Sequence, residues 1–172
     1  DGPVSVAVFR GCVMPEDNAA QSLLDDVAQQ IGVGPLKLDA VHSSCNLNYQ
    51  DRFEVSIVAP PYSDDLYLAA PIIDIDPDKK LELFERVLQL NYLVLETDGA
   101  TFAIDDESAQ LILCAAFSLQ DLTAEQLVKH LENFIQTSAK HWEAFNSSVA
   151  ESVAAADEDP GPGPANAEIM RG

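Results

Sequence analysis

The three histidines and three cysteines of this 172-residue chain are the side chains that most often bind metals or act as nucleophiles and bases. His130 and His141 fall on one face of a predicted helix. Three helical turns, about 16 Å, separate them, so they cannot share a metal ion. We expect both to be surface or helix-terminal residues. His42 and Cys45 are close in sequence, but no third group near them would orient a catalytic pair, and a turn or strand position is the simpler interpretation.

The cysteines predict neither a zinc site nor a disulfide framework. Cys12, Cys45 and Cys114 are odd in number and widely spaced, and no CxxC pair occurs. Cys114 lies in an apolar run and is expected to behave as a small buried hydrophobic residue. This usage is typical of a reducing cytosol.

A calcium loop is the one metal pattern that needs testing. Asp74, Asp76, Asp78 and Glu85 fall at its first, third, fifth and twelfth positions. Lys79 stands where the sharp turn requires glycine, and a proline inside the loop begins a helix. We therefore expect Asp76 to cap a helix. No GxSxG, HExxH or phosphate-binding glycine loop occurs either, so the sequence predicts no catalytic residue, no metal and no cofactor.

The formal charge of −20, from 29 acidic and 9 basic residues, restricts the class of partner. Such a surface repels nucleic-acid phosphates and anionic lipid headgroups. A basic or neutral polypeptide is the more natural partner. No apolar run reaches the roughly 18 residues of a membrane span, so membrane insertion is not expected.

Apolar spacing predicts the first half of the fold. Residues 18–31 form a helix with one apolar stripe, capped by Asp17 or Asn18 and closed by Gly32. Residues 36–59 alternate as half-buried strands around a turn at 48–51. A further strand spans 66–73, and its proline, Pro71, is expected to end it or to lie at a sheet edge.

The second helix is predicted from Asp76-Pro77 to about Asn91 and is apolar on two sides. Both stripes follow helical spacing, and they consist of Leu81, Phe84 and Leu88, and of Leu83, Val87 and Leu90. A helix this broadly apolar is covered twice. Its own sheet can cover one side, and a partner subunit is the simplest cover for the other.

The second half completes an α+β fold, a single-domain α/β sandwich with an antiparallel twisted sheet. Strands are predicted at 100–105 and at 109–117, the latter buried on both faces. Thr123 and Gln126 form a capping box that opens the last helix, which runs to about Phe145. We expect residues 1–17 to be a flexible segment (1–13 being vector-derived or upstream sequence), 18–146 to form the domain, and the acidic, Pro/Gly-rich residues 147–172 to be a disordered tail.

Three stretches carry a resemblance to a known family: LLDDVAQQIGVGPLKLD at 23–39, FERVLQLNYLVLETDGATFAIDDESAQLILCAAFSL at 84–119 and LTAEQLVKHLENFIQ at 122–136. Over residues 18–146 the chain resembles the class I type III secretion chaperones, the CesT or Tir-chaperone family. The resemblance implies a cytoplasmic bacterial homodimer, formed largely through the second helix and nearby strands, that catalyses nothing and needs no nucleotide. Its client would be the N-terminal chaperone-binding segment of an effector, held extended, soluble and secretion-competent, and delivered to the secretion ATPase.

Two groups of apolar residues are candidates for these contacts. The first helix and first strands offer a groove with a free strand edge, where an extended peptide could add as a strand. The predicted client-binding residues are Leu24, Val27, Ile31, Leu36, Leu38, Val55 and Ile57. The predicted dimer residues are Leu83, Val87, Leu90, Leu93 and Leu113. For every one of them an ordinary core position is the alternative, since regularly spaced apolar residues usually form the core.

Two other functions stay open at this point. A non-catalytic adaptor of the same fold, working outside secretion, would bind a folded partner. A small enzyme with an unrecognised site would need a concave pocket with shifted titratable groups, and the sequence offers no convergent His, Cys or Lys set to build it.

Overall fold

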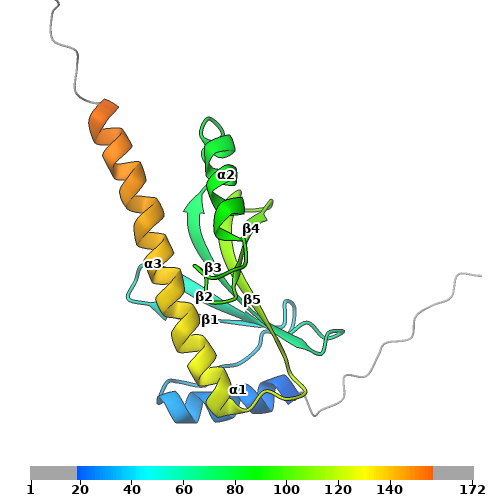
Figure 1. The fold of residues 1–172 in the computed structure, drawn as a ribbon. Helices are drawn as coiled ribbons and strands as arrows, with labels where there is room; N and C mark the ends of the chain where they lie inside the picture. The colour runs from blue at the N-terminus through cyan, green and yellow to red at the C-terminus, as the bar shows by residue number, and fades with distance from the viewer. Residues whose placement is uncertain (1–18, 157–172) are drawn as a thin grey trace, which may run out of the picture.

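The computed structural model describes residues 19–156, with side chains through residue 147. Five strands form one antiparallel, twisted sheet accompanied by three helices (Figure 1). In chain order the elements are α1 (Ala19–Ile31), β1 (Ser44–Tyr49), β2 (Phe53–Val58), β3 (Asp65–Asp74), α2 (Lys80–Leu90), β4 (Thr101–Asp105), β5 (Gln110–Ser118) and α3 (Ala124–Ala156). The strand order is β1-β2-β3-β5-β4, which leaves β1 and β4 at the edges. The predicted α+β fold is confirmed.

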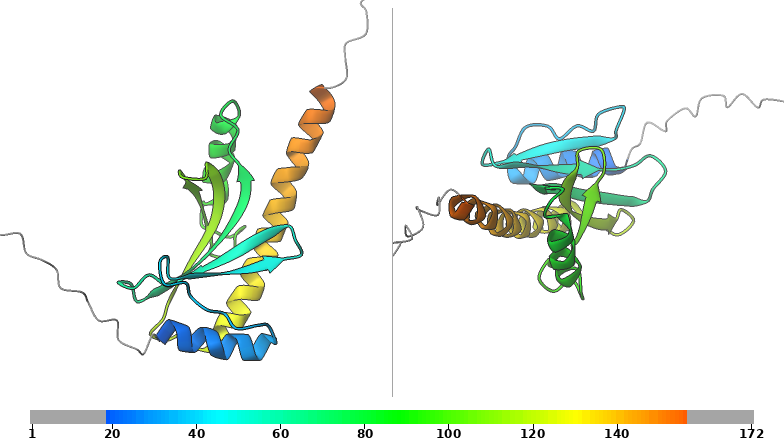
Figure 2. Two further views of the ribbon diagram at one scale, coloured as in Figure 1. Left: turned by 180° about the vertical axis from the view of Figure 1, so that it is seen from behind. Right: turned by 90° about the horizontal axis from the view of Figure 1, so that it is seen from above.

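All three helices contribute to one apolar core. α3 crosses the molecule, α1 packs across its N-terminal part, and α2 lies at the opposite end of the sheet (Figures 1 and 2). Along β3, fully buried residues alternate with half-buried ones, so one face of the sheet carries the core. The fully buried side chains at its centre are Leu24, Val27, Val55, Ile57, Leu66, Leu68, Ile72, Leu111, Leu113 and Leu127.

Two predicted helix ends are confirmed. Gly32 adopts φ +70° after α1, and the N–H groups of Gly32 and Val33 donate to the Ala28 carbonyl over 3.0 and 3.2 Å. Glycine adopts this left-handed conformation without steric penalty. Before α3, the Thr123 N–H donates to Gln126 Oε1 (2.9 Å) and the Gln126 N–H donates to Thr123 Oγ1 (3.3 Å). This reciprocal pair is the predicted capping box.

Residues 36–38 were predicted as part of a strand, and that prediction is wrong. The sheet begins at Ser44, and the preceding segment lies along α1. The Gln21 side chain donates from Nε2 to the Leu36 carbonyl (2.9 Å) and accepts from the Leu38 N–H (3.0 Å). One amide side chain therefore satisfies the backbone groups that a neighbouring strand would otherwise pair.

Pro71 does not end its strand, because β3 continues to Asp74. Pairing of β3 with β2 stops at Ala69, and the register with β5 shifts between Pro71 and Ile73. Within the described part of the chain, the proline therefore lies where β3 has a strand neighbour on one side only, a position that tolerates the missing N–H.

Three further boundaries differ from the prediction. α2 begins at Lys80, because the Asp76 carboxylate accepts from the Asp78 N–H (2.9 Å) and closes a separate turn before the helix. β5 is fully buried on one face only, since its alternate residues Ile112 and Cys114 are half-buried. α3 continues to Ala156, eleven residues past the predicted end and into the stretch predicted as a tail, where alanine favours the helix. The predictions for residues 1–18 and 157–172 lie outside the described residues.

Candidate interaction surfaces

The predicted client-binding residues come together, but mostly inside the molecule. Leu24, Val27, Leu36, Val55 and Ile57 are buried in the core, and Leu38 packs against it. Ile31, at the end of α1, is exposed over 37% of its surface. Most of the predicted client-binding residues therefore occupy core positions, the alternative that regular apolar spacing also allowed.

Among the described residues β1 is an outer strand of the sheet with no strand on its far side, as the predicted free edge requires. The Ala59 N–H donates to the Ser43 carbonyl (2.9 Å), so the backbone groups of Ser43, Cys45 and Leu47 face β2. Those of Asn46 and Asn48 face away from the sheet, and both residues are exposed. A row of outward backbone groups can pair with an added strand.

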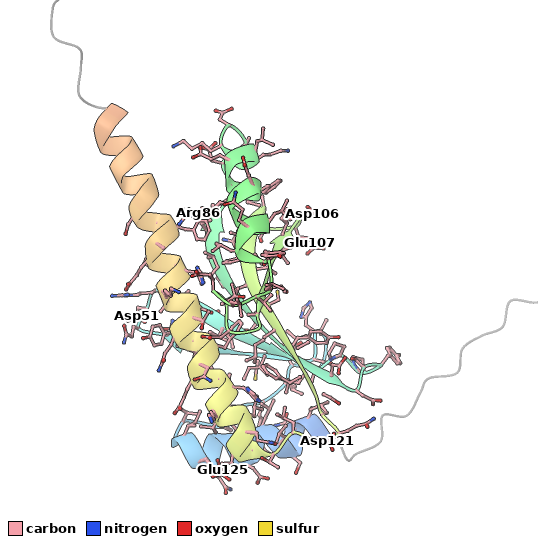
Figure 3. The ribbon with its side chains drawn as sticks, in the orientation of Figure 1. Asp51, Arg86, Asp106, Glu107, Asp121 and Glu125 are labelled. Atoms are coloured by element: carbon pink, nitrogen blue, oxygen red, sulfur yellow. The ribbon has the colours of Figure 1, made fainter. Side chains whose placement is uncertain are left out.

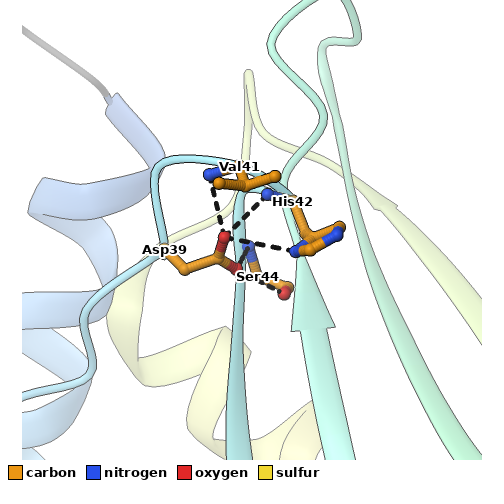
Figure 4. A network of polar contacts seen from close by, with 4 residues as sticks. All are labelled: Asp39, Val41, His42 and Ser44. Atoms are coloured by element: carbon orange, nitrogen blue, oxygen red, sulfur yellow. Dashed lines mark hydrogen bonds and ion pairs between the residues drawn. The ribbon is translucent and has the colours of Figure 1, made fainter.

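The loop before β1 is fixed by one carboxylate (Figure 4). Asp39 accepts hydrogen bonds from the N–H groups of Val41 (2.9 Å) and His42 (2.7 Å) and from the N–H and hydroxyl of Ser44 (3.3 and 2.9 Å). These bonds, the His42 N–H first among them, hold the pKa of Asp39 well below its usual value. The network sets where the edge strand begins.

His42 lies in this loop, whereas Cys45 lies in strand β1. The His42 ring contacts the Asp39 carboxylate at 3.4 Å and is largely exposed. Cys45 packs against the core, and burial raises the pKa of its thiol. A thiol with a raised pKa stays protonated and is a poor nucleophile.

The two apolar stripes of α2 are separated by the fold. Val87 is buried, and Leu83 and Leu90 pack against the core. On the other stripe Leu81 is 82% and Leu88 71% exposed. Among the predicted dimer residues, Leu113 is fully buried in β5 and Leu93 is exposed. The sequence showed both stripes, but hydrophobicity alone gives no signal for which one the chain's own sheet covers.

Residues 91–99 connect α2 to β4 and are tied down at both ends. The Asn91 side chain donates to the Phe102 carbonyl (3.2 Å) and accepts from the Phe102 N–H (2.8 Å). From α3, Thr137 donates to Asp98 (2.9 Å) and His141 Nε2 bonds to the Glu96 carbonyl (3.0 Å). The connector nevertheless exposes Tyr92, Leu93 and Leu95. We call Leu81, Leu88, Tyr92, Leu93 and Leu95 the exposed α2 set.

The prediction that both α3 histidines lie at the surface is wrong for His141. Its ring is 4% exposed and meets Phe102 edge-on, with 5.1 Å between the ring centroids. Burial lowers the pKa of His141, and the bond to the Glu96 carbonyl partly opposes this. His130, half-buried, stacks on Phe117 at 4.4 Å. Both imidazoles thus have structural partners, and within residues 19–156 no group of three potential ligands could hold a metal ion.

Acidic side chains are spread around the domain. Asp51 lies in the β1–β2 turn, Asp106 and Glu107 in the β4–β5 turn, and Asp121 and Glu125 at the start of α3, all directed outward (Figure 3). Of the helices in the described part of the chain, none is long and apolar enough to span a membrane.

Comparison with known proteins identifies the family. The family model of the Tir chaperone protein (CesT) family matches residues 22–143, which include every strand and α2. The chain belongs to the CesT family. Among curated proteins no sequence matches this CesT-family chain.

Solved structures share the fold at low sequence identity. A chain of the HopA1–SchA chaperone–effector complex is 18% identical, with 73% of this chain and 94% of that chain covered and a TM-score of 0.60. A chain of the ExsC–ExsE complex is 20% identical, with coverages of 69% and 87% and a TM-score of 0.59. YbjN from E. coli is 16% identical, with coverages of 74% and 91% and a TM-score of 0.56. The fold therefore also occurs in a structure that is not described as a chaperone–effector complex.

Proposed function

We propose that this CesT-family protein is a type III secretion chaperone of the bacterial cytoplasm. It binds the N-terminal chaperone-binding segment of an effector, keeps that segment soluble and secretion-competent, and delivers it to the secretion ATPase. It acts by binding alone and catalyses no reaction. The observation that carries the proposal is the free backbone edge of β1 in a domain that matches this family.

The β1 edge suits an extended polypeptide. The outward backbone groups of Asn46 and Asn48 can hydrogen-bond an added strand, which gives affinity without requiring one particular sequence. Ile31 at the end of α1 and Val33 just after it are exposed apolar side chains that a client segment could also contact. The buried members of the predicted client-binding set, among them Val55 and Ile57 of the neighbouring strand β2, belong to the core on which β1 is held. A preformed edge reduces the entropy cost of binding.

The homodimer is part of this proposal. The exposed α2 set presents large apolar side chains to water, which is unfavourable for a lone subunit. An isologous contact, in which the same residues of two copies face each other, would remove this surface from water. Leu83 and Leu90 lie on nearly the opposite side of α2, where they pack against the core, so Leu93 is the predicted dimer residue that belongs to this surface.

A non-catalytic adaptor outside secretion is the second candidate, because the same fold occurs in YbjN, a protein that is not described as a secretion chaperone. Such an adaptor would bind a folded partner and would ignore an unfolded segment. The two candidates therefore differ in the state of the partner that they capture.

Co-expression with the N-terminal segment of the effector encoded by the neighbouring gene tests the proposal. Light scattering after size exclusion should show a dimer carrying the segment, and the bound segment should resist protease. Asn46→Pro, which removes one outward N–H from β1, should weaken capture without unfolding the domain. A wild-type protein that captures no unfolded segment but binds a folded partner would favour the adaptor.

A further inference from the structure

The opposite side of the sheet contains a second, shorter stretch of unpaired edge. β4 pairs with β5 from Asp105↔Gln110 to Thr101↔Cys114 and then turns away, whereas β3 stays paired with β5 as far as Ser118. Within the described chain, residues 115–118 of β5 therefore have a strand neighbour on the β3 side only.

The direction of the backbone groups follows from the ladder. The Leu119 N–H donates to the Asp64 carbonyl (2.7 Å), which continues the β3–β5 pairing by one residue. In an antiparallel pair successive residues direct their hydrogen-bonding groups to opposite sides. Phe117 and Ala115 therefore bond toward β3, and the N–H and C=O of Ala116 and Ser118 point to the side that β4 has left. Both residues are exposed.

A cleft of about 180 Å³ adjoins this edge. The turn before β4 forms one wall, residues 115–117 of β5 the second and α3 the third, so the cleft has room for one side chain. Its lining residues are Thr97, Asp98, Gly99, Ala100, Ala115, Ala116, Phe117, His130, Asn133, Phe134 and Thr137.

The lining combines a flat apolar wall with one carboxylate. His130 stacks on Phe117 with 28° between the ring planes, and Phe134, which also lines the cleft, is buried. The exposed Asp98 carries the only formal negative charge among the lining residues, and no Lys or Arg lines the cleft to neutralise it. Thr137 donates to Oδ2 of Asp98 and so fixes the carboxylate in place. A long aliphatic stem that ends in a cation matches such a site, and arginine also stacks on aromatic rings.

We propose that the β5 edge and this cleft form a second recognition site for the client, separate from β1. An extended client segment continues the line of β4, bonds to Ala116 and Ser118, and places an arginine or lysine side chain in the cleft against Asp98. The net charge of −20 favours a basic segment over an acidic one. This inference rests on the proposed function, since the segment it describes belongs to the same unfolded client.

A defined peptide tests the charge preference directly. The full chain, labelled with ¹⁵N, is titrated with acetyl-Thr-Val-Arg-Val-Thr-amide and with the same peptide carrying Glu in place of Arg. The arginine peptide should shift the amide signals of Ala116, Ser118 and Asn133 and bind about fivefold more tightly, the range of one exposed ion pair. Asp98→Asn keeps the acceptor for Thr137 and tolerates the positive φ of 50°, and it should abolish the preference. Equal binding of both peptides, or shifts confined to β1, would overturn the proposal.

Three variants then separate this site from β1 in the co-expression assay. Ala116→Pro removes an N–H that β3 does not use, and Asn133→Trp fills the cleft from an exposed helix position. Each should leave the protein folded and reduce protease protection of the client. Gln136→Trp, exposed on α3 but outside the cleft lining, should leave that protection unchanged.

Normal protection in Ala116→Pro and Asn133→Trp, with loss in Asn46→Pro, would refute the second site alone. Failure of the wild-type chain to capture any client would refute the proposed function itself. Occupation of the β5 edge by residues preceding Ala19 of the same chain, detected as contacts to Ala116 without peptide, would also overturn the client assignment.

Discussion

His141 is a buried polar residue whose protonation state matters for stability. Three charged groups approach it from different elements, namely Lys140 of α3, Arg86 of α2 and Glu96 of the connector. Burial lowers the pKa of His141 below the value of about 6.5 that it has in an unfolded chain. As the pH falls through 6.5, the unfolded chain binds a proton that the folded chain does not. The free energy of unfolding must therefore decrease in this range and level off once the folded-state pKa is passed.

His141→Gln tests this pH dependence. The variant keeps a donor for the Glu96 carbonyl but cannot titrate. It should lower the free energy of unfolding by about 1 kcal/mol at pH 7.5, a common size for a single substitution. Urea unfolding at pH 7.5 and pH 5.5 should show a smaller loss of stability on acidification than in the wild type. His42→Gln, at a largely exposed ring, serves as the control and should behave as the wild type. If His141→Gln and the wild type lose the same unfolding free energy between pH 7.5 and pH 5.5, other groups cause the pH dependence.

At the scale of single residues, apolar periodicity located the core better than it located surfaces. Leu24, Val27, Val55 and Ile57 were chosen for regular spacing, which is the property that places a side chain inside a domain. The β1 edge is available because the backbone of Asn46 and Asn48 points outward, and a backbone group has no sequence signature. The burial of His141 was equally hidden, because its acceptor is a main-chain carbonyl 45 residues away.

Among the elements, α2 carries the clearest prediction about assembly. Leu81 and Leu88 are seven residues apart and therefore lie on one helix face, and each would gain about 1.5–3 kcal/mol on full burial against a second copy. Leu88→Glu places a carboxylate in each half of an isologous contact. The dissociation constant of the dimer should therefore rise at least about tenfold. Light scattering over a concentration series measures the effect. Circular dichroism should be unchanged, since Leu88 is exposed within the subunit.

Gln89→Glu is the matched control for this variant. It adds the same charge one position along α2, away from the face shared by Leu81 and Leu88, and should leave the dimer intact. Dissociation by Gln89→Glu as well would point to general repulsion in an already acidic protein. If the wild-type chain stays monomeric at tens of micromolar, the proposed dimer through α2 is contradicted.

Short sequence patterns predicted the features that depend on neighbouring residues, such as helix ends. They missed the features that depend on tertiary packing. The end of α1 at Gly32 and the start of α3 at Thr123 were correct because turn chemistry and capping act within a few residues. The alternation around Leu36 and Leu38 wrongly predicts a strand, because an extended segment shows the same pattern whether a strand or the Gln21 side chain bonds its backbone. The one-sided burial of β5 depends on where the three helices pack, which no short window contains.

For the whole molecule, the net charge of −20 should act mainly on the rate of client association. Acidic groups lie on turns and helix ends around the domain, so the field is not confined to one site (Figure 3). A basic client segment is then attracted before contact, and added salt screens that attraction over about 10 Å at 0.1 M. Backbone pairing and apolar contacts, once formed, are less sensitive to salt.

Surface-plasmon measurements with an immobilised client segment should therefore separate the two rates. Between 50 and 500 mM NaCl the association rate should fall by about tenfold, while the dissociation rate changes little. Asp98→Asn should affect the dissociation rate more than the association rate. It removes one of 29 acidic side chains, which changes the overall attraction little, but it also removes the proposed direct contact with the bound client. An association rate that is constant or rises with salt would mean that apolar contacts, and not the acidic surface, select the client.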